Sequence, residues 1–262
     1  MRLRVLGCSG GIGGQQNRTT SFLLDDDILI DAGTGVGDLS LSELTLIDHI
    51  FITHSHLDHV NSIAFFVDSV GALRPHPVTV YALGATIEIL KKNLFNWDVW
   101  PDFTMIPTPE QPWLRYQEIA VGEVLDLGGR KVTVLPAVHT VPAVGYLLDS
   151  GKGSLVFTGD TGPNDALWSV VNEIENLRFL IIETAFSDKD RALAELSKHL
   201  CPSMLGIGIY TSFARRGCTK VRCMLETGSM PLRNLNWMQG SLSAGRSWCS
   251  SMCAARKRWR RA

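Results

Sequence analysis

The chain has 262 residues and a net charge of −1, with 45% hydrophobic and 19% charged residues. A chain of this length can bury a substantial core as one large domain or two small ones. No apolar run approaches the roughly 20 residues that span a bilayer, and the N-terminus enters a strand pattern without a signal-peptide layout. We therefore expect a cytoplasmic protein without a membrane partner, whose six cysteines are free thiols.

The charge divides the chain at about residue 205. Residues 1–205 carry 25 acidic and 14 basic side chains, a net charge of −11, whereas residues 206–262 carry one acidic and 11 basic side chains, a net charge of +10. All seven histidines precede residue 200, and four of the six cysteines follow residue 205. We expect a folded domain over 1–205 and a divergent basic tail over 206–262.

Strand patterns open the chain. Residues 2–6 predict a first strand, and residues 22–24 and 28–30 flank three aspartates in the pattern of a β-hairpin. The glycine-rich segment 7–14 contains no Gly-Lys-Ser/Thr, so it does not support a P-loop. A mobile connection and a phosphate cradle are both open interpretations of this segment.

Four residues of metal-binding type follow the apolar run 50–52, which predicts a short buried strand. The segment reads Thr53-His54-Ser55-His56-Leu57-Asp58-His59. His54 and His56 are two apart on an extended strand exit and can face one ion, while Asp58 and His59 follow at the turn into the helical stretch 60–70 and can face another. Helix capping by Asp58 explains only one of these residues, so we favour a metal site on a strand–helix loop.

This His-x-His-x-Asp-His pattern after a hydrophobic strand resembles the signature of the metallo-β-lactamase superfamily. The resemblance implies an α/β fold, the four-layer αββα sandwich, with one or two metal ions at the sheet edges. Helices are predicted over 42–49, 60–70, 85–95, 167–174 and 189–200, and strands over 77–83, 114–121, 123–127, 131–136, 145–149, 154–157 and 177–182. The long loop 96–112 holds Trp97, Trp100 and Phe103, which either roof a pocket or pack on the loop itself.

The resemblance gives roles to residues that would otherwise be ordinary strand ends. Asp31, in Asp31-Ala32-Gly33, and Thr53 would support the metal site from beneath. His139 follows the strand over 131–136, and Asp160 follows the strand over 154–157, where the superfamily has its bridging carboxylate. The implied ligands are His54, His56 and His139 for a first ion, and Asp58, His59 and the bridging Asp160 for a second.

Within the superfamily, residues 1–205 look most like the bacterial class II 3′,5′-cyclic-nucleotide phosphodiesterases of the ribonuclease Z-like branch. The segments that carry this likeness are Gly7-Cys8-Ser9-Gly10-Gly11, Arg18-Thr19-Thr20-Ser21, Ile182-Glu183-Thr184-Ala185-Phe186-Ser187 and Ser197-Lys198-His199-Leu200. The likeness implies that His199, steadied by Glu183, acts beside the metals, so that Asp58, Glu183 and His199 form the catalytic set. Without it, His199 would be a histidine of the last helical turn, favoured by the helix dipole.

The implied function is hydrolysis of a small cyclic nucleotide, of the 3′,5′-cyclic AMP type, by a metal-bound hydroxide. Two divalent ions are the expected cofactors: the imidazoles favour Zn²⁺, and the carboxylates also admit Mn²⁺ or Fe²⁺. A homodimer is compatible with the sequence. The acidic domain disfavours nucleic acid as a partner, which counts against the alternative enzyme class, a tRNA 3′-end endoribonuclease. Ribonuclease Z also carries a tRNA-binding arm, for which we see no insertion.

The family pattern breaks after residue 205. The family would continue with a helix, a strand and a Thr-His that supplies the last ligand of the second ion, but no histidine follows His199. We hypothesise a shifted reading frame, an idea that fails if neither other frame of the gene encodes those three features. A nucleic-acid-binding tail is a second interpretation, whereas the loose spacing of Cys218, Cys223, Cys249 and Cys253 disfavours a zinc site. A metal-binding but inactive product is therefore a third functional class.

Overall fold

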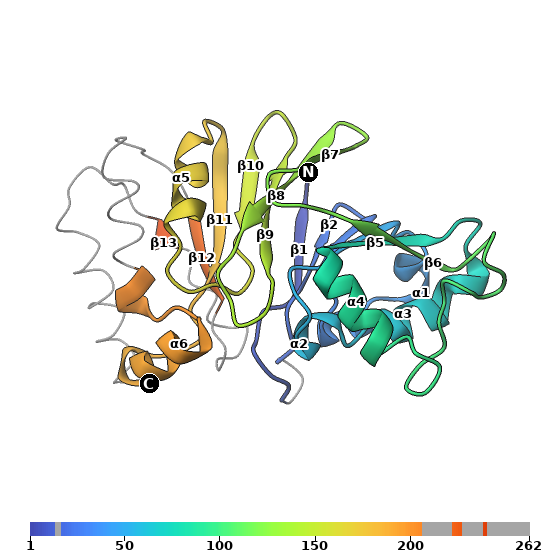
Figure 1. The fold of residues 1–262 in the computed structure, drawn as a ribbon. Coiled ribbons are helices and arrows are strands. Elements are labelled where there is room, and N and C mark those ends of the chain that lie inside the picture. The colour runs from blue at the N-terminus through green and yellow to red at the C-terminus, as the bar shows by residue number, and fades with distance from the viewer. Residues whose placement is uncertain (14–16, 206–221, 227–237, 240–262) are drawn as a thin grey trace.

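The computed structural model describes residues 1–13, 17–205, 222–226 and 238–239, and it contains two facing β-sheets with helices outside them (Figure 1). The first sheet has the strand order β1-β2-β3-β4-β5-β6. Its strands are β1 (Leu3–Gly7), β2 (Ser21–Leu24), β3 (Ile28–Ile30), β4 (His49–Phe51), β5 (Val78–Ala82) and β6 (Leu114–Glu118). The predicted hairpin is the antiparallel pair β2–β3, and the pairs from β3 to β6 are parallel.

The second sheet has the order β13-β12-β11-β10-β9-β8-β7. Its strands are β7 (Val124–Leu127), β8 (Arg130–Pro136), β9 (Val144–Asp149), β10 (Ser154–Phe157), β11 (Leu177–Glu183), β12 (Arg222–Glu226) and β13 (Met238–Gln239). β8, β10 and β11 run in one direction, because β9 is antiparallel to both β8 and β10 while β11 is parallel to β10. The carboxyl ends of these three strands therefore meet at one edge of the sheet.

Helices cover the outer face of each sheet (Figure 1). The first sheet is covered by α1 (Leu41–Leu44), α2 (Leu57–Val60), α3 (Ile63–Val70) and α4 (Gly84–Asn93), and the second by α5 (Asp165–Glu173) and α6 (Arg191–Ser197). Short 3₁₀ turns occupy Thr34–Asp38, Gly71–Leu73 and Asp188–Asp190. No helix of the described residues is long and apolar enough to cross a membrane.

Three clusters of buried apolar side chains fill the spaces between four layers. β11 shows the pattern: Ile181 packs in the cluster between the sheets, whereas Leu180 and Ile182 pack in the outer cluster under α5 and α6. This alternation follows from the two-residue period of a strand that is covered on both faces. A third cluster joins the first sheet to α1, α3 and α4. These layers confirm the predicted αββα sandwich.

Two helix predictions were too long. The helix predicted over 42–49 is only α1, which begins with a capping box between Ser40 and Glu43. The helix predicted over 189–200 is a 3₁₀ turn followed by α6, which ends where Lys198 adopts a left-handed conformation with φ 54° and ψ 49°. His199 therefore lies in the loop after α6, and the interpretation of His199 as a residue of the last helical turn is wrong.

Strands that follow one another in the sequence belong to different sheets here. The segments predicted as strands over 114–121 and 123–127 are β6 and β7, and β6 pairs with β5 in the first sheet while β7 pairs with β8 in the second. The chain crosses between the sheets at residues 119–123, where Ile119 is buried in the cluster between them. Periodicity predicts each strand but cannot predict this crossing, because both strands have one buried face.

Most of the basic tail lies outside the described residues, so the domain boundary at 205 and the shifted-frame hypothesis stay predictions. Within the tail, the backbone of β12 adds to β11 in parallel, with Phe179 opposite Arg222 and Glu183 opposite Glu226. The cysteines and the basic residues on which the zinc and nucleic-acid interpretations of the tail rest also lie largely outside the described residues.

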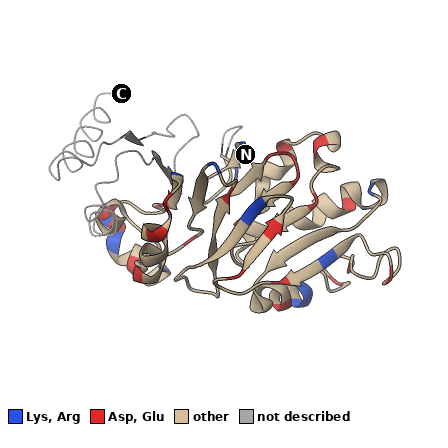
Figure 2. Cartoon of the chain, turned by 90° about the horizontal axis from the view of Figure 1, so that it is seen from above, with Lys and Arg blue, Asp and Glu red and all other residues tan. Residues whose placement is uncertain are grey.

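In the domain itself, basic residues are scattered among acidic ones in the view of Figure 2.

A hydroxyl that crosses between the two sheets supplies a test of the fold. The fully buried Tyr146 of β9 donates to the carbonyl oxygen of Ile52, directly before the histidine motif, at 2.6 Å. Tyr146→Phe leaves this buried acceptor unpaired, so we expect it to lower the free energy of unfolding by about 1–3 kcal/mol. The measurement is the urea unfolding midpoint at constant m-value.

Tyr116 is the matched control, because its hydroxyl is buried and has no hydrogen-bond partner within the described residues. Tyr116→Phe should leave the midpoint unchanged or raise it, since the change removes an unpaired polar group. Equal losses of stability in the two variants would contradict a specific role for the bond between Tyr146 and Ile52.

Candidate metal centre

The carboxylate of Asp31 organises the histidine motif. Asp31 follows β3, is completely buried and accepts hydrogen bonds from the Thr53 backbone N–H at 2.8 Å and from His59 Nδ1 at 2.8 Å. The Thr53 hydroxyl also donates to it, at 2.8 Å. Burial raises the pKa of Asp31, whereas the charge and hydrogen bond of His59 and the hydrogen bonds of Thr53 act to lower it. His59 and Thr53 act only as hydrogen-bond donors to this carboxylate. Asp31 therefore serves as an acceptor that holds the loop after β4 against the end of β3.

The Thr53 hydroxyl also orients the ring of His54. Since it donates to Asp31, it can only accept from His54 Nδ1, which lies 3.0 Å away. The Nε2 of His54 then carries the lone pair, and this buried atom has no hydrogen-bond partner among the residues that the structure describes. An unpaired buried nitrogen is costly unless a ligand satisfies it, so His54 Nε2 could bind a metal ion.

His59 is oriented by a direct hydrogen bond from Nδ1 to Asp31. Burial alone would lower the pKa of His59, but the carboxylates of Asp160 and Asp31 hold it well above its ordinary value. Its Nδ1 faces Asp31, which leaves Nε2 directed toward Asp160 Oδ2 at 3.4 Å and Asp58 Oδ2 at 3.6 Å. A carboxylate behind a histidine is the usual support of a metal-binding imidazole. The backbones approach closely here, because a Cβ at Gly33 would lie 2.6 Å from the Asp58 carbonyl oxygen. Gly33 therefore allows the loop carrying Asp58 and His59 to lie against β3.

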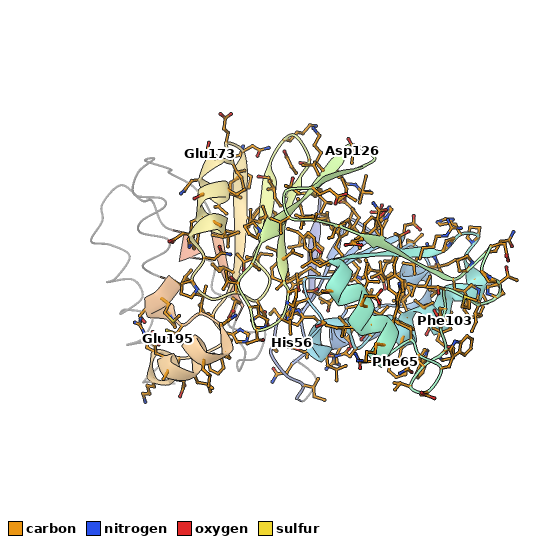
Figure 3. The ribbon with its side chains drawn as sticks, viewed as in Figure 1. His56, Phe65, Phe103, Asp126, Glu173 and Glu195 are labelled. Carbon is orange, nitrogen blue, oxygen red and sulfur yellow. The ribbon has the colours of Figure 1, made fainter. Side chains whose placement is uncertain are left out.

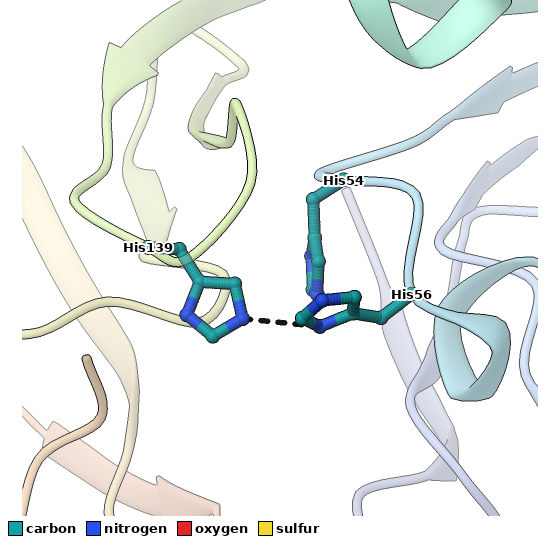
Figure 4. Close-up of side chains that lie close together, drawn as sticks. All are labelled: His54, His56 and His139. Carbon is teal, nitrogen blue, oxygen red and sulfur yellow. Dashed lines mark hydrogen bonds between the residues drawn. The ribbon is translucent and has the colours of Figure 1, made fainter. Parts of the chain in front are cut away.

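His139 lies in the loop after β8 of the second sheet. Its Nε2 lies 3.1 Å from His56 Nδ1, and the ring of His54 is beside both (Figure 4). Figure 3 places His56 at the lower edge of the sandwich, between the two halves of the molecule. Three imidazoles from two sheets thus converge on one point at the sheet edge.

Asp160 lies between two groups of ligand atoms. It follows β10, and its Oδ2 is 3.7 Å from His54 Nε2, 3.4 Å from His59 Nε2 and 3.9 Å from His199 Nδ1. Burial alone would raise the pKa of Asp160, but the neighbouring imidazoles, His59 foremost, hold it below its ordinary value. Asp160 is therefore an ionised carboxylate that belongs to two of the groups of side chains that could hold a metal ion.

Glu183 and His199 form a third part of the site. Glu183 ends β11 and accepts from His199 Nδ1 at 2.7 Å, from the Thr161 N–H at 3.0 Å and from the Ala185 N–H at 2.9 Å. Burial alone would lower the pKa of His199, but the hydrogen bond and charge of Glu183 raise it above its ordinary value. The pair can hold a proton beside Asp160.

The residues present fit divalent metal ions. Their ligand atoms lie within 4.8 Å of one another in three overlapping groups: His54, His56 and His139; His54, His59 and Asp160; His139, Asp160 and His199. Burial lowers the pKa of His54, His56 and His139, which keeps these rings neutral and able to coordinate. Neutral imidazoles with carboxylates suit Zn²⁺, Mn²⁺ or Fe²⁺.

A cavity of about 630 Å³ opens above this cluster. Its described lining residues are Gly10, Thr20, His56, Asp58, His59, Asp160, Glu183, Ala185, Phe186, Ser187, Asp190 and His199. The volume lies in the range of small-molecule sites. Gly10 of the glycine-rich segment belongs to the lining, whereas Trp97, Trp100 and Phe103 do not, so the loop 96–112 does not roof this cavity. Phe103 packs instead against Phe95 and Trp113.

The structure brings together all the predicted site residues, which sequence reasoning had assigned from one motif and a resemblance. It also adds residues that were missed. Thr161 accepts from the Val138 N–H at 3.0 Å and ties the loop of Asp160 to the loop of His139, and Lys198 contacts His139. The sequence holds no local signal for these contacts, because they join segments 23 and 59 residues apart.

Asp31→Asn tests the support of the motif. Asparagine has the size of aspartate and also tolerates the left-handed backbone at this residue, where φ is 53°. It lacks the negative charge and one of the two acceptor oxygens. We expect a loss of about 3 kcal/mol in the free energy of unfolding and a fall of about 10- to 100-fold in metal affinity. Asp25→Asn is the control, because Asp25 has φ 50° but lies far from the cluster and is partly exposed. Similar effects in both variants would contradict the role of Asp31.

Metal removal supplies a second test. Stripping the protein with a chelator and then adding Zn²⁺ at about 100 times its dissociation constant should stabilise the fold by about 2.7 kcal/mol. For a domain of this size we expect a rise of about 5–10 °C in melting temperature. His54→Gln removes the unpaired Nε2 and should remove most of the rise. An equal rise in this variant would show that the ion binds elsewhere.

Comparisons with known proteins agree with this geometry. The sequence profile described as Beta-lactamase superfamily domain matches residues 26–212, more than half of the chain. A probable 3′,5′-cyclic-nucleotide phosphodiesterase of Yersinia pestis is 30% identical over 244 residues, which cover 77% of this chain and 69% of the relative. A ribonuclease BN of Salmonella paratyphi B is 31% identical over 157 residues, which cover 56% of this chain and 48% of the relative.

Solved structures show the same architecture. Unliganded yeast PDE1 superposes with a TM-score of 0.72 at 18% sequence identity, covering 89% of each chain. At this identity the likeness concerns the fold alone. The profile match and the relative of 30% identity carry the family assignment. The chain therefore belongs to the beta-lactamase superfamily, as a hydrolase with the metallo-β-lactamase fold.

Proposed function

We propose that this protein is a metal-dependent phosphodiesterase that hydrolyses a small cyclic nucleotide of the 3′,5′-cyclic AMP type. The observation that carries the proposal is the convergence of His54, His59, His139 and Asp160 beside a cavity. His59, Asp160 and the pair Glu183–His199 line that cavity. The names of relatives in Yersinia pestis and Aliivibrio fischeri, both 3′,5′-cyclic-nucleotide phosphodiesterases, support the substrate class.

The metal ligands divide between two positions. We assign His54, His56 and His139 to a first ion and Asp58 and His59 to a second, with Asp160 shared between them. Bound divalent ions would supply Lewis acidity, lowering the pKa of a water molecule and offsetting charge on the phosphate. We favour Zn²⁺ because most of the ligands are imidazoles, and Mn²⁺ or Fe²⁺ also suit the mixed donor set.

His199 is the residue that we assign to proton transfer. Its Nδ1–H donates to Glu183 Oε1 at 2.7 Å, so Nε2 is free to give a proton to the leaving 3′-oxygen or to a phosphate oxygen. Glu183 holds the ring and stabilises its charged form. The reaction is balanced. The OH of water joins phosphorus as the bond from phosphorus to the 3′-oxygen breaks, and the proton that water releases replaces the one that His199 gives to that oxygen.

The charge of the cavity favours a small substrate. Its described lining includes Asp58, Asp160, Glu183 and Asp190 but no Lys or Arg. A single phosphodiester carries one negative charge, which the bound ions can offset, whereas a tRNA brings many phosphates into the field of an acidic domain. This argument disfavours the alternative tRNA 3′-end endoribonuclease, which the likeness to ribonuclease BN keeps as the second candidate.

The second ion has few protein ligands in this chain. The family resemblance implies a final histidine ligand past residue 205, and the sequence has no histidine after His199. We therefore propose tight binding of the first ion and weaker binding of the second. A fully inactive product is the limiting case, and elemental analysis of the purified protein distinguishes one bound ion from two.

A comparison of two substrates tests the proposal. One preparation, loaded with Zn²⁺ or Mn²⁺, is offered 3′,5′-cyclic AMP and a precursor tRNA, and we expect hydrolysis of the cyclic nucleotide. Cleavage of the tRNA alone would overturn our choice of substrate. Cleavage of neither by protein holding two ions per chain would overturn both substrate assignments, whereas cleavage of neither by protein holding one ion or none would favour the inactive product.

His199→Asn tests the proton-transfer residue. We expect kcat to fall by about 10²- to 10⁴-fold with metal content unchanged. His76→Asn is the control, because His76 is exposed, pairs with Asp48 and lies outside the cavity lining. A fall of less than about threefold in His199→Asn would contradict the assigned role.

A further inference from the structure

Lys198 has a backbone conformation that its side chain does not favour. It ends α6 at φ 54° and ψ 49°, in the left-handed region where glycine or asparagine is usual. Unlike asparagine, lysine does not offset this strain with a hydrogen bond from its side chain to its neighbouring backbone. A lysine at such a position is explained only if its side chain makes contacts that glycine cannot make.

Those contacts are made with a proposed metal ligand. The Nζ of Lys198 donates to the His139 carbonyl oxygen at 3.1 Å, and the Lys198 carbonyl oxygen lies 3.2 Å from His139 Nδ1. Each side chain thus contacts the backbone carbonyl oxygen of the other residue. With its Nδ1–H donated to Lys198, the ring of His139 directs the lone pair of Nε2 toward His56, 3.1 Å away.

The same residue also lies near the loop of Asp160. A Cβ at Gly162 would lie 3.5 Å from the Cα and the carbonyl carbon of Lys198, so a single added methyl group would fill the space between the two backbones. The Gly162 N–H in turn donates to the Val138 carbonyl oxygen at 2.8 Å. Lys198 therefore lies where the loops that carry His139, Asp160 and His199 meet.

We infer that Lys198 is a positioning residue, whose side chain locks the loop of His139 so that the imidazole is oriented for metal binding at the expense of backbone strain at the end of α6. The inference rests on the proposed metal site. It does not require that the substrate be a cyclic nucleotide. Its signature is a separation between stability and metal affinity, because removal of the side chain relieves strain while it loosens a ligand.

Three substitutions at one position isolate the side chain. Lys198→Gly relieves the left-handed strain and keeps the carbonyl acceptor, Lys198→Met keeps the strain and removes Nζ, and Lys198→Arg keeps a donor. Lys189→Met is the control, because Lys189 is an exposed lysine in the 3₁₀ turn before α6. Zn²⁺ affinity is measured on metal-free protein by competition with a chromophoric chelator, and stability by urea unfolding of the same metal-free samples.

For Lys198→Gly we expect an unfolding midpoint equal to or above that of the original protein, together with Zn²⁺ affinity about 10-fold lower. Lys198→Met should lower affinity by a similar factor, Lys198→Arg should restore it to within about threefold, and Lys189→Met should change neither property. Unchanged affinity in Lys198→Gly would overturn the inference. So would a loss of affinity that Lys198→Arg fails to restore.

The outcome is separable from that of the proposed function. If the original protein binds Zn²⁺ with the expected dependence on Lys198 but does not hydrolyse 3′,5′-cyclic AMP, the positioning role holds and the substrate assignment fails. If the original protein binds no Zn²⁺, both the metal site and the role of Lys198 are refuted.

Discussion

The buried carboxylate of Asp31 is the interaction on which the site depends. It has no access to water, and its three donors all come from the histidine motif: the N–H and hydroxyl of Thr53 and the Nδ1–H of His59. Through Thr53 it also sets the tautomer of His54. One acceptor at the end of β3 thus decides that Nε2 of both His54 and His59 faces Asp160. Glu183 has the corresponding position in the second sheet, since it joins His199 to the loop that follows Asp160.

The sandwich brings these two acceptors to one edge. β3 and β4 are parallel in the first sheet, and β8, β10 and β11 share a direction in the second, so their carboxyl ends leave functional loops on the same side of the molecule. The apolar cluster between the sheets holds these ends at a fixed separation, with Phe51 and Tyr146 in contact at 5.4 Å between ring centroids. The site is therefore a consequence of packing between sheets as much as of the motif.

The electrostatics of the edge call for cations. Asp31, Asp160 and Glu183 are buried or nearly so, and no Lys or Arg is found among the described lining residues of the cavity. Buried carboxylates are costly unless they are paired. His59 and His199 pair with them, and a divalent ion would add positive charge that the neutral imidazoles of the cluster can also bind. Lys198, just outside the lining, contributes by holding a backbone rather than by offering charge to the cavity.

The sequence by itself determined the motif His54 to His59 and the strand before it. Through resemblance it predicted the four-layer fold and gave His139 and Asp160 as candidate ligands. Local periodicity carries the strands, because burial on one or two faces repeats at a fixed interval, whereas the fold and the distant residues come only from the resemblance. Only the tertiary structure decided that α6 ends at Ser197, that β6 and β7 lie in different sheets, and that Lys198 holds His139 from 59 residues away. These features depend on contacts between segments distant in the chain, and such contacts leave no periodic signal in the sequence.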